Sequence, residues 1–77
     1  MKMYSSRIKR VNNKIVVEII DNEFLEYNFV IEISRNVIEK IIDTITDYEA
    51  ENKCIVDITP IISDLILLYK EKWKVGE

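Results

Sequence analysis

One stretch of this sequence, from Phe24 to Ile33, alternates between apolar and polar residues with a period of two. In a helix, whose period is 3.6 residues, the same side chains would be scattered around the axis. The pattern therefore predicts a β-strand with one buried face. The apolar residues expected on that face are Leu25, Tyr27, Phe29, Ile31 and Ile33.

Two further strands are predicted before this one, separated by Asn12-Asn13. Asparagine tolerates the positive φ angles that a two-residue type I′ hairpin turn requires. Such a turn would place Arg7 opposite Glu18 as an oppositely charged cross-strand pair, and Ile8 opposite Val17 on the other face. Register and chemistry both favour a hairpin at this position.

The connection to the alternating strand is predicted at Asp21-Asn22-Glu23. A loop of three residues would bring Ile19 opposite Leu25 and Val17 opposite Tyr27, whereas a two-residue loop would mix the two faces. The three strands would then form an antiparallel meander. Residues 14–20 are the most apolar of the three strands and are expected in the centre.

Two amphipathic helices are predicted after the strands. The first begins near Ser34 or Asn36, with Asn52 as a left-handed C-cap, and the second begins at Thr59-Pro60. Residues 54–58 between them fit a short fourth strand or a buried connection equally well. The apolar stripes are Val37, Ile38, Ile41, Ile42, Ile45 and Tyr48 in the first helix and Ile61, Ile62, Leu65, Ile66, Leu68, Tyr69 and Trp73 in the second.

These elements predict a single α+β domain over residues 1–77, with both helices packed on one face of the meander. A chain of 77 residues with one cysteine has a small core and no intrachain disulfide. We therefore expect a homodimer, formed through the open sheet face, a strand edge or exposed Leu67. The open face is expected to carry Val11, Val16, Ile20, Phe24 and Val30, which are either scattered surface hydrophobes or a partner surface.

The residue types that are missing exclude several classes of function. The sole glycine is Gly76 and there is no histidine, so phosphate-binding glycine loops, histidine-dependent triads and most zinc sites are excluded. We expect no cofactor, no metal and no enzymatic activity. Cys54 has no histidine to activate it, and Asp57 and Asp64 fit helix-capping and first-turn positions rather than catalytic ones.

Charge is distributed unevenly along the chain. Residues 1–17 hold five basic residues and no acidic one, whereas residues 18–69 hold twelve acidic and three basic residues. Within the first helix, four carboxylates recur every fourth residue and would form one exposed ridge, about 6 Å apart along the axis. They are Glu39, Asp43, Asp47 and Glu51, which we call the acidic ridge.

The acidic ridge has two interpretations: a solvated helix face, or a docking surface for a protein partner with a basic surface. Our leading functional hypothesis is the second, a small inhibitor, adaptor or regulatory subunit that acts by surface contact. A hard cation such as calcium requires oxygen ligands that converge on one point. Carboxylates spread along one helix face diverge into solvent, so the ridge is not expected to hold such a cation.

The alternative hypothesis is nucleic-acid binding. The predicted first hairpin carries Arg7, Lys9, Arg10 and Lys14, which could follow a phosphate backbone. Near the C-terminus, Tyr69, Lys70, Lys72, Trp73 and Lys74 interleave bases and aromatics, as single-strand binders do. A net charge of −3 argues against tight duplex binding.

No apolar run reaches the length of about 18–20 residues that spans a bilayer, so no membrane contact is expected. The N-terminal residues lack the apolar segment of a signal peptide. With a single unpaired cysteine, these features favour a cytoplasmic location.

Overall fold

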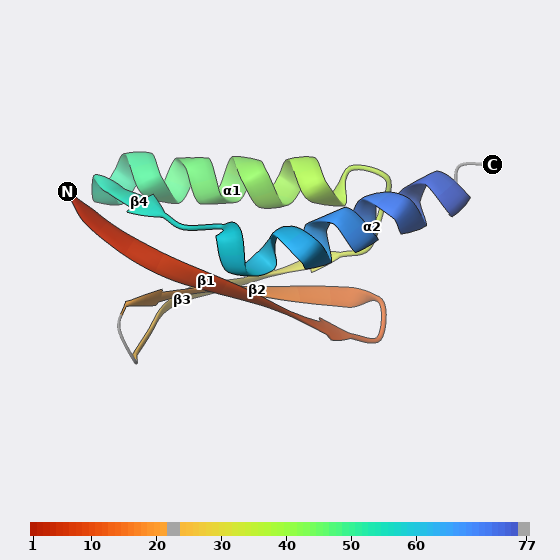
Figure 1. Ribbon diagram of the computed structural model, residues 1–77, viewed down its shortest axis with the longest axis horizontal. Helices are drawn as coiled ribbons and strands as arrows, with labels where there is room; N and C mark the ends of the chain where they lie inside the picture. The colour runs from red at the N-terminus through yellow and green to blue at the C-terminus, as the bar shows by residue number, and fades with distance from the viewer. Residues whose placement is uncertain (22–23, 76–77) are drawn as a thin grey trace.

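A four-stranded sheet with both helices on one of its faces makes up the protein, so the α+β prediction is confirmed (Figure 1). The computed structural model describes residues 1–21 and 24–75, with side chains up to residue 70. The elements are β1 (Lys2–Val11), β2 (Lys14–Asp21), β3 (Phe24–Glu32), α1 (Val37–Asn52), β4 (Cys54–Val56), the 3-10 turn η1 (Thr59–Ile61) and α2 (Ile62–Val75).

The sheet order is β3-β2-β1-β4, and β4 is the short fourth strand that the sequence left open. It runs parallel to β1, with Lys2 beside Cys54 and Tyr4 beside Val56. The Asp57 amide continues this pairing by donating to the Tyr4 carbonyl at 2.7 Å. Because β3 and β4 are opposite edges, α1 must cross the sheet between them, as parallel pairing generally requires.

The β1–β2 register is the one predicted, with Arg7 opposite Glu18 and Ile8 opposite Val17. The turn between them differs from a type I′ turn. Among the described residues, only Asn12 and Lys53 have positive φ, so Asn13 does not. A type I′ turn needs positive φ at both central residues. Of the two turn residues, Asn12 alone, at φ 57, adopts a positive φ angle.

The predicted β2–β3 register is wrong by two residues. Asp21 pairs with Phe24, so two residues rather than three lie between the strands, and both lie outside the described residues. Ile20 pairs with Leu25 but Ile19 pairs with Tyr27, which leaves Glu26 as an extra residue in a β-bulge. The bulge places the apolar residues of β2 and β3 on the same face of the sheet, which the three-residue loop was expected to do. It also moves Leu25 to the helix-free face, where it is 50% exposed.

The core lies between β2 and the helices. From the central strand, Ile15, Val17 and Ile19 are fully buried. Each helix buries fewer apolar residues than its predicted stripe. Exposed members of those stripes are Ile42, Ile62, Ile66 and Tyr69; Leu67 is exposed as expected. Buried helical residues are Val37, Ile41, Ile45, Ile61, Leu65 and Leu68.

The predicted start of α1 is confirmed, with Asn36 in the N-cap position, whereas its C-cap differs from the prediction. Lys53, at φ 51, is the left-handed C-cap of α1, and the Asn52 side chain donates to the Tyr48 carbonyl at 3.0 Å. Asn36 makes no side-chain cap. Before η1, the Asp57 carboxylate accepts the Thr59 amide at 2.9 Å, but the N-cap position itself is Ile58, without a side-chain cap. Hydrogen bonds from Thr59, side chain first and backbone second, lower the pKa of Asp57.

Candidate functional site

The four carboxylates of the acidic ridge are all exposed on α1, as their spacing requires. The structure divides them into two pairs. Glu39 and Asp43 lie on the N-terminal half of the helix, away from any described cavity, whereas Asp47 and Glu51 border a groove.

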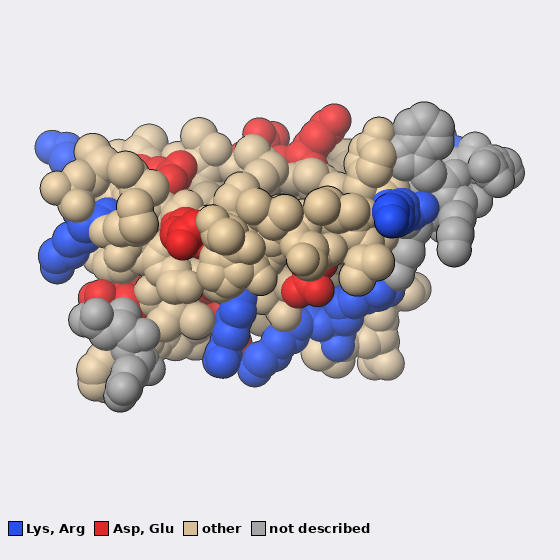
Figure 2. Space-filling model, in the orientation of Figure 1, with Lys and Arg blue, Asp and Glu red and all other residues tan. Residues whose placement is uncertain are grey.

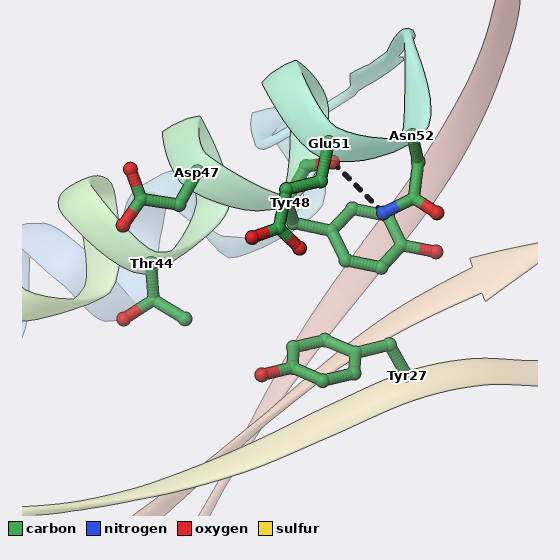
Figure 3. A pocket seen from close by; sticks show the side chains of 6 residues that line it. All are labelled: Tyr27, Thr44, Asp47, Tyr48, Glu51 and Asn52. Atoms are coloured by element: carbon green, nitrogen blue, oxygen red, sulfur yellow. Dashed lines mark hydrogen bonds between the residues drawn. The ribbon is translucent and has the colours of Figure 1, made fainter.

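This groove has a volume of about 400 Å³ and lies between α1 and β3. The helix supplies one wall and the edge strand supplies the other (Figure 3). We call it the tyrosine groove. It is lined by Tyr27, Thr44, Asp47, Tyr48, Glu51 and Asn52.

Two stacked tyrosines form the floor and inner wall of the groove. The rings of Tyr27 and Tyr48 have centroids 5.0 Å apart and an interplanar angle of 24° (Figure 3). On its inner side Tyr48 meets Tyr4 of β1 in a tilted contact, with centroids 6.5 Å apart. Tyr4 is buried, whereas Tyr27 remains 38% exposed. The stack therefore joins the core to the surface.

Sequence reasoning found the carboxylates of this site but missed its tyrosines. Tyr27 and Tyr48 each belong to an apolar pattern, and nothing in the spacing of either pattern places one ring on the other. Their contact depends on the β2–β3 register, which pairs Tyr27 of the edge strand with Ile19 of β2. That register is one of the features of the fold that were predicted wrongly.

The environment of Tyr48 holds its hydroxyl in the neutral form. Burial is the largest cause, and the negative charge of Glu26, with a hydrogen bond to it, adds to the effect; together they raise the pKa of Tyr48 to about 12. Burial, followed by the charge of Glu26, also raises the pKa of Tyr4. Glu26, the extra residue in the bulge of β3, therefore influences both tyrosines.

We expect this shift to weaken the fold at alkaline pH. A tyrosine whose pKa is raised on folding stabilises the protein fully below its unfolded pKa of about 10. That contribution disappears as the pH rises through the folded value of about 12. Urea unfolding at pH 8 and pH 11 should show a larger loss of stability for the wild type than for Tyr48→Phe. Equal losses of stability in the two proteins would contradict a raised pKa for Tyr48.

The chemistry of the groove suits a cation. Carboxylates pair with ammonium or guanidinium groups, and the face of a tyrosine ring attracts the same groups through its quadrupole. Asp47 and Glu51 come from the helix wall, and Tyr27 comes from the opposite strand (Figure 3). A side chain entering between them would meet both kinds of contact at once.

The basic residues of the first hairpin do not form one free cationic surface. Arg7 pairs with Glu18, and the Lys9 ammonium lies 3.7 Å from the other carboxylate oxygen of Glu18. The hydrogen bond from Arg7 is the main cause of the lowered pKa of Glu18. Lys14 shares the face of Arg7 and Lys9, but Arg10 pairs with Ile15 and so belongs to the helix side. Basic side chains gather below the helices in Figure 2, over the strands.

The residues considered as catalytic candidates in the sequence lie in positions that do not favour catalysis. Cys54 is 5% exposed, and its pKa is raised, first by burial and then by the charges of Glu49 and Glu26. A thiol in such surroundings is a poor nucleophile. Asp57 accepts the Thr59 amide at the start of η1, and Asp64 is exposed in the first turn of α2. Among the described residues, no group of three or more potential ligands is arranged to hold a metal ion.

Within the described part of the chain, none of the helices is long and apolar enough to cross a membrane. Of the proposed single-strand-binding residues, Tyr69 and Lys70 are exposed on α2, and the side chains of Lys72, Trp73 and Lys74 lie outside the described residues.

Comparison of the chain with protein-family models, curated proteins and solved structures gives no match in any of the three.

Proposed function

We propose that this protein is a non-catalytic binding protein whose tyrosine groove takes a basic side chain from a protein partner. The acidic ridge continues from the groove along α1 and would contact further basic residues of the same partner. This is the inhibitor, adaptor or regulatory role expected from the sequence, now assigned to a smaller surface.

The observation that carries the proposal is the position of Asp47 and Glu51 beside the stacked pair of Tyr27 and Tyr48. A solvated helix face needs no aromatic neighbour. Like charges at a spacing of four residues cost about 0.2–0.5 kcal/mol per pair, and a cation in the groove would offset that cost. Arginine fits best, because its planar guanidinium can stack on a ring while it donates to a carboxylate.

The distribution of charge favours the helix side over the open sheet face as the binding surface, and a basic protein over nucleic acid as the partner. At the centre of the open face, Glu18 is 6% exposed and pairs with both Arg7 and Lys9. These two cations are partly neutralised there, which weakens their attraction for a phosphate backbone. The carboxylates of the groove are exposed and pair with no described residue at salt-bridge distance.

A direct test uses a labelled peptide of alternating arginine and serine, titrated with the protein and followed by fluorescence anisotropy. The matched control peptide replaces each arginine by citrulline, which keeps the shape and removes the charge. We expect the arginine peptide to bind at least about tenfold more tightly, a difference of about 1.4 kcal/mol. Equal binding of the two peptides would contradict the proposal.

The nucleic-acid alternative is tested in the same assay with a labelled DNA duplex. Sub-micromolar binding that weakens steeply with salt, and less steeply after Arg7→Gln and Lys9→Gln, would favour that alternative. We expect no such complex, because the acidic body repels phosphate within about 8–10 Å.

A further inference from the structure

The two edge strands of the sheet differ in how readily they could pair with a strand of another molecule. β4 has three residues, and the outward amide of Val56 is already bound by the Glu49 carboxylate at 2.8 Å. A short edge strand with an occupied donor is a poor template for another strand. β3, at the other edge, runs for nine residues, from Phe24 to Glu32.

The outward backbone groups of β3 can be identified from the ladder. Ile33 donates its amide to Asn13 of the β1–β2 turn, at 2.8 Å. In an antiparallel pair the hydrogen-bonded residues alternate, so Ile31 and Phe29 also face β2. The amides and carbonyls of Asn28, Val30 and Glu32 therefore point away from the sheet. Among the described residues, none of these outward groups has a backbone hydrogen bond to another element.

We propose that the outer edge of β3 pairs with β3 of a second copy of this chain, antiparallel and about a two-fold axis through Val30. In this register each Val30 exchanges two main-chain hydrogen bonds with its counterpart, and Asn28 does so with Glu32 of the second copy. The interface gains about six main-chain hydrogen bonds. The two four-stranded sheets become one continuous sheet.

Side-chain chemistry selects this register among its neighbours. Val30, 57% exposed, meets its own apolar counterpart, and the Asn28 amide meets the Glu32 carboxylate. Shifting the register by two residues in one direction brings Glu26 opposite Glu32 and takes the pairing into the bulge. Shifting it in the other direction shortens the paired segment to residues 30–32. The register centred on Val30 avoids both costs.

A second copy is the natural occupant because the chain is small and the edge is self-complementary. A domain of this size buries a limited core, so the additional burial on association contributes more than it would in a larger protein. A symmetric pair also closes on itself, with β3 used once in each copy and the β4 edges blocked by Glu49. Growth into a longer sheet is thereby prevented.

The pairing stands independently of the proposed function. Its hydrogen bonds lie in the plane of the sheet, whereas the tyrosine groove lies on the helix side. Tyr27 is at the end of the paired segment, opposite Ile33 of the second copy. The two grooves of a dimer would therefore lie on either side of the two-fold axis.

The test uses charge at the position that faces itself. Sedimentation of the wild type at about 100 µM, a concentration suited to weak dimers, should give a species of twice the 9.2 kDa chain mass. Val30→Lys and Val30→Glu should each weaken the dimer at least tenfold, because like charges then meet on the axis. An equimolar mixture of the two variants should associate again through opposite charges.

Val11→Lys is the matched control. Val11 is 54% exposed on the same face, but it lies in β1 rather than at the free edge. This variant should sediment like the wild type. A monomeric wild type at this concentration would overturn the proposal. So would a Val30→Lys dimer of undiminished strength, or a mixture of the two charged variants that stays monomeric while each variant keeps a wild-type circular dichroism spectrum.

Discussion

Replacement of both Asp47 and Glu51 by lysine is expected to abolish binding of an arginine peptide and leave the melting temperature unchanged within about two degrees. The variant turns two attractive contacts into two repulsive ones, and like charges brought together at an interface cost several kcal/mol. Binding should therefore fall by a hundredfold or more. Both side chains are exposed and lie outside the core, so the fold should tolerate the change.

The matched control reverses the other half of the ridge, Glu39 and Asp43. Both pairs lie on α1 and both change the net charge by the same amount. If the groove is the binding site, this control should weaken binding only a few-fold, through the loss of long-range attraction. Equal losses from the two double variants would assign binding to the ridge as a whole. Unchanged binding in both would move it to another surface.

The second large effect concerns stability. Ile41→Ala should lower the free energy of unfolding by about 2–5 kcal/mol, because it removes a fully buried side chain and leaves a cavity between α1 and the sheet. For a domain of this size, a loss of 3 kcal/mol corresponds to a fall of roughly 12–24 °C in melting temperature. Thermal unfolding followed by circular dichroism measures both quantities.

Ile42 provides the control for this prediction. It is the next residue, of the same type and in the same helix, but it is 37% exposed. Substitution by alanine changes helix propensity equally at both positions, so the difference between the two variants isolates the effect of burial. Ile42→Ala should cost under about 1 kcal/mol. Similar losses at the two positions would mean that α1 does not pack as described.

The fold could be predicted from the sequence wherever one periodic pattern determined an element. The alternation in β3 and the charge pairing of Arg7 with Glu18 were enough for the meander and its first register. The second register could not be predicted, because a two-residue connection with a bulge at Glu26 matches the faces as well as a three-residue loop does. Local patterns do not distinguish these two solutions.

The candidate site was predictable only in part, for a related reason. Exposure of the four ridge carboxylates follows from helix geometry alone. The contact between Tyr27 and Tyr48 joins a strand to a helix, and it depends on how far along the sheet the helix crosses. The left-handed C-cap of α1 also lies one residue beyond the predicted Asn52, at Lys53, while the Asn52 side chain donates to the Tyr48 carbonyl.

The path of α1 across the sheet also bears on the order in which the molecule assembles. The hairpins of β1, β2 and β3 join residues close in sequence, so little chain entropy is lost in forming them. β4 pairs with β1 across a separation of about fifty residues, and it reaches that edge only after α1 has spanned the sheet. During synthesis β1 could therefore pair with β4 only after most of the chain had emerged from the ribosome.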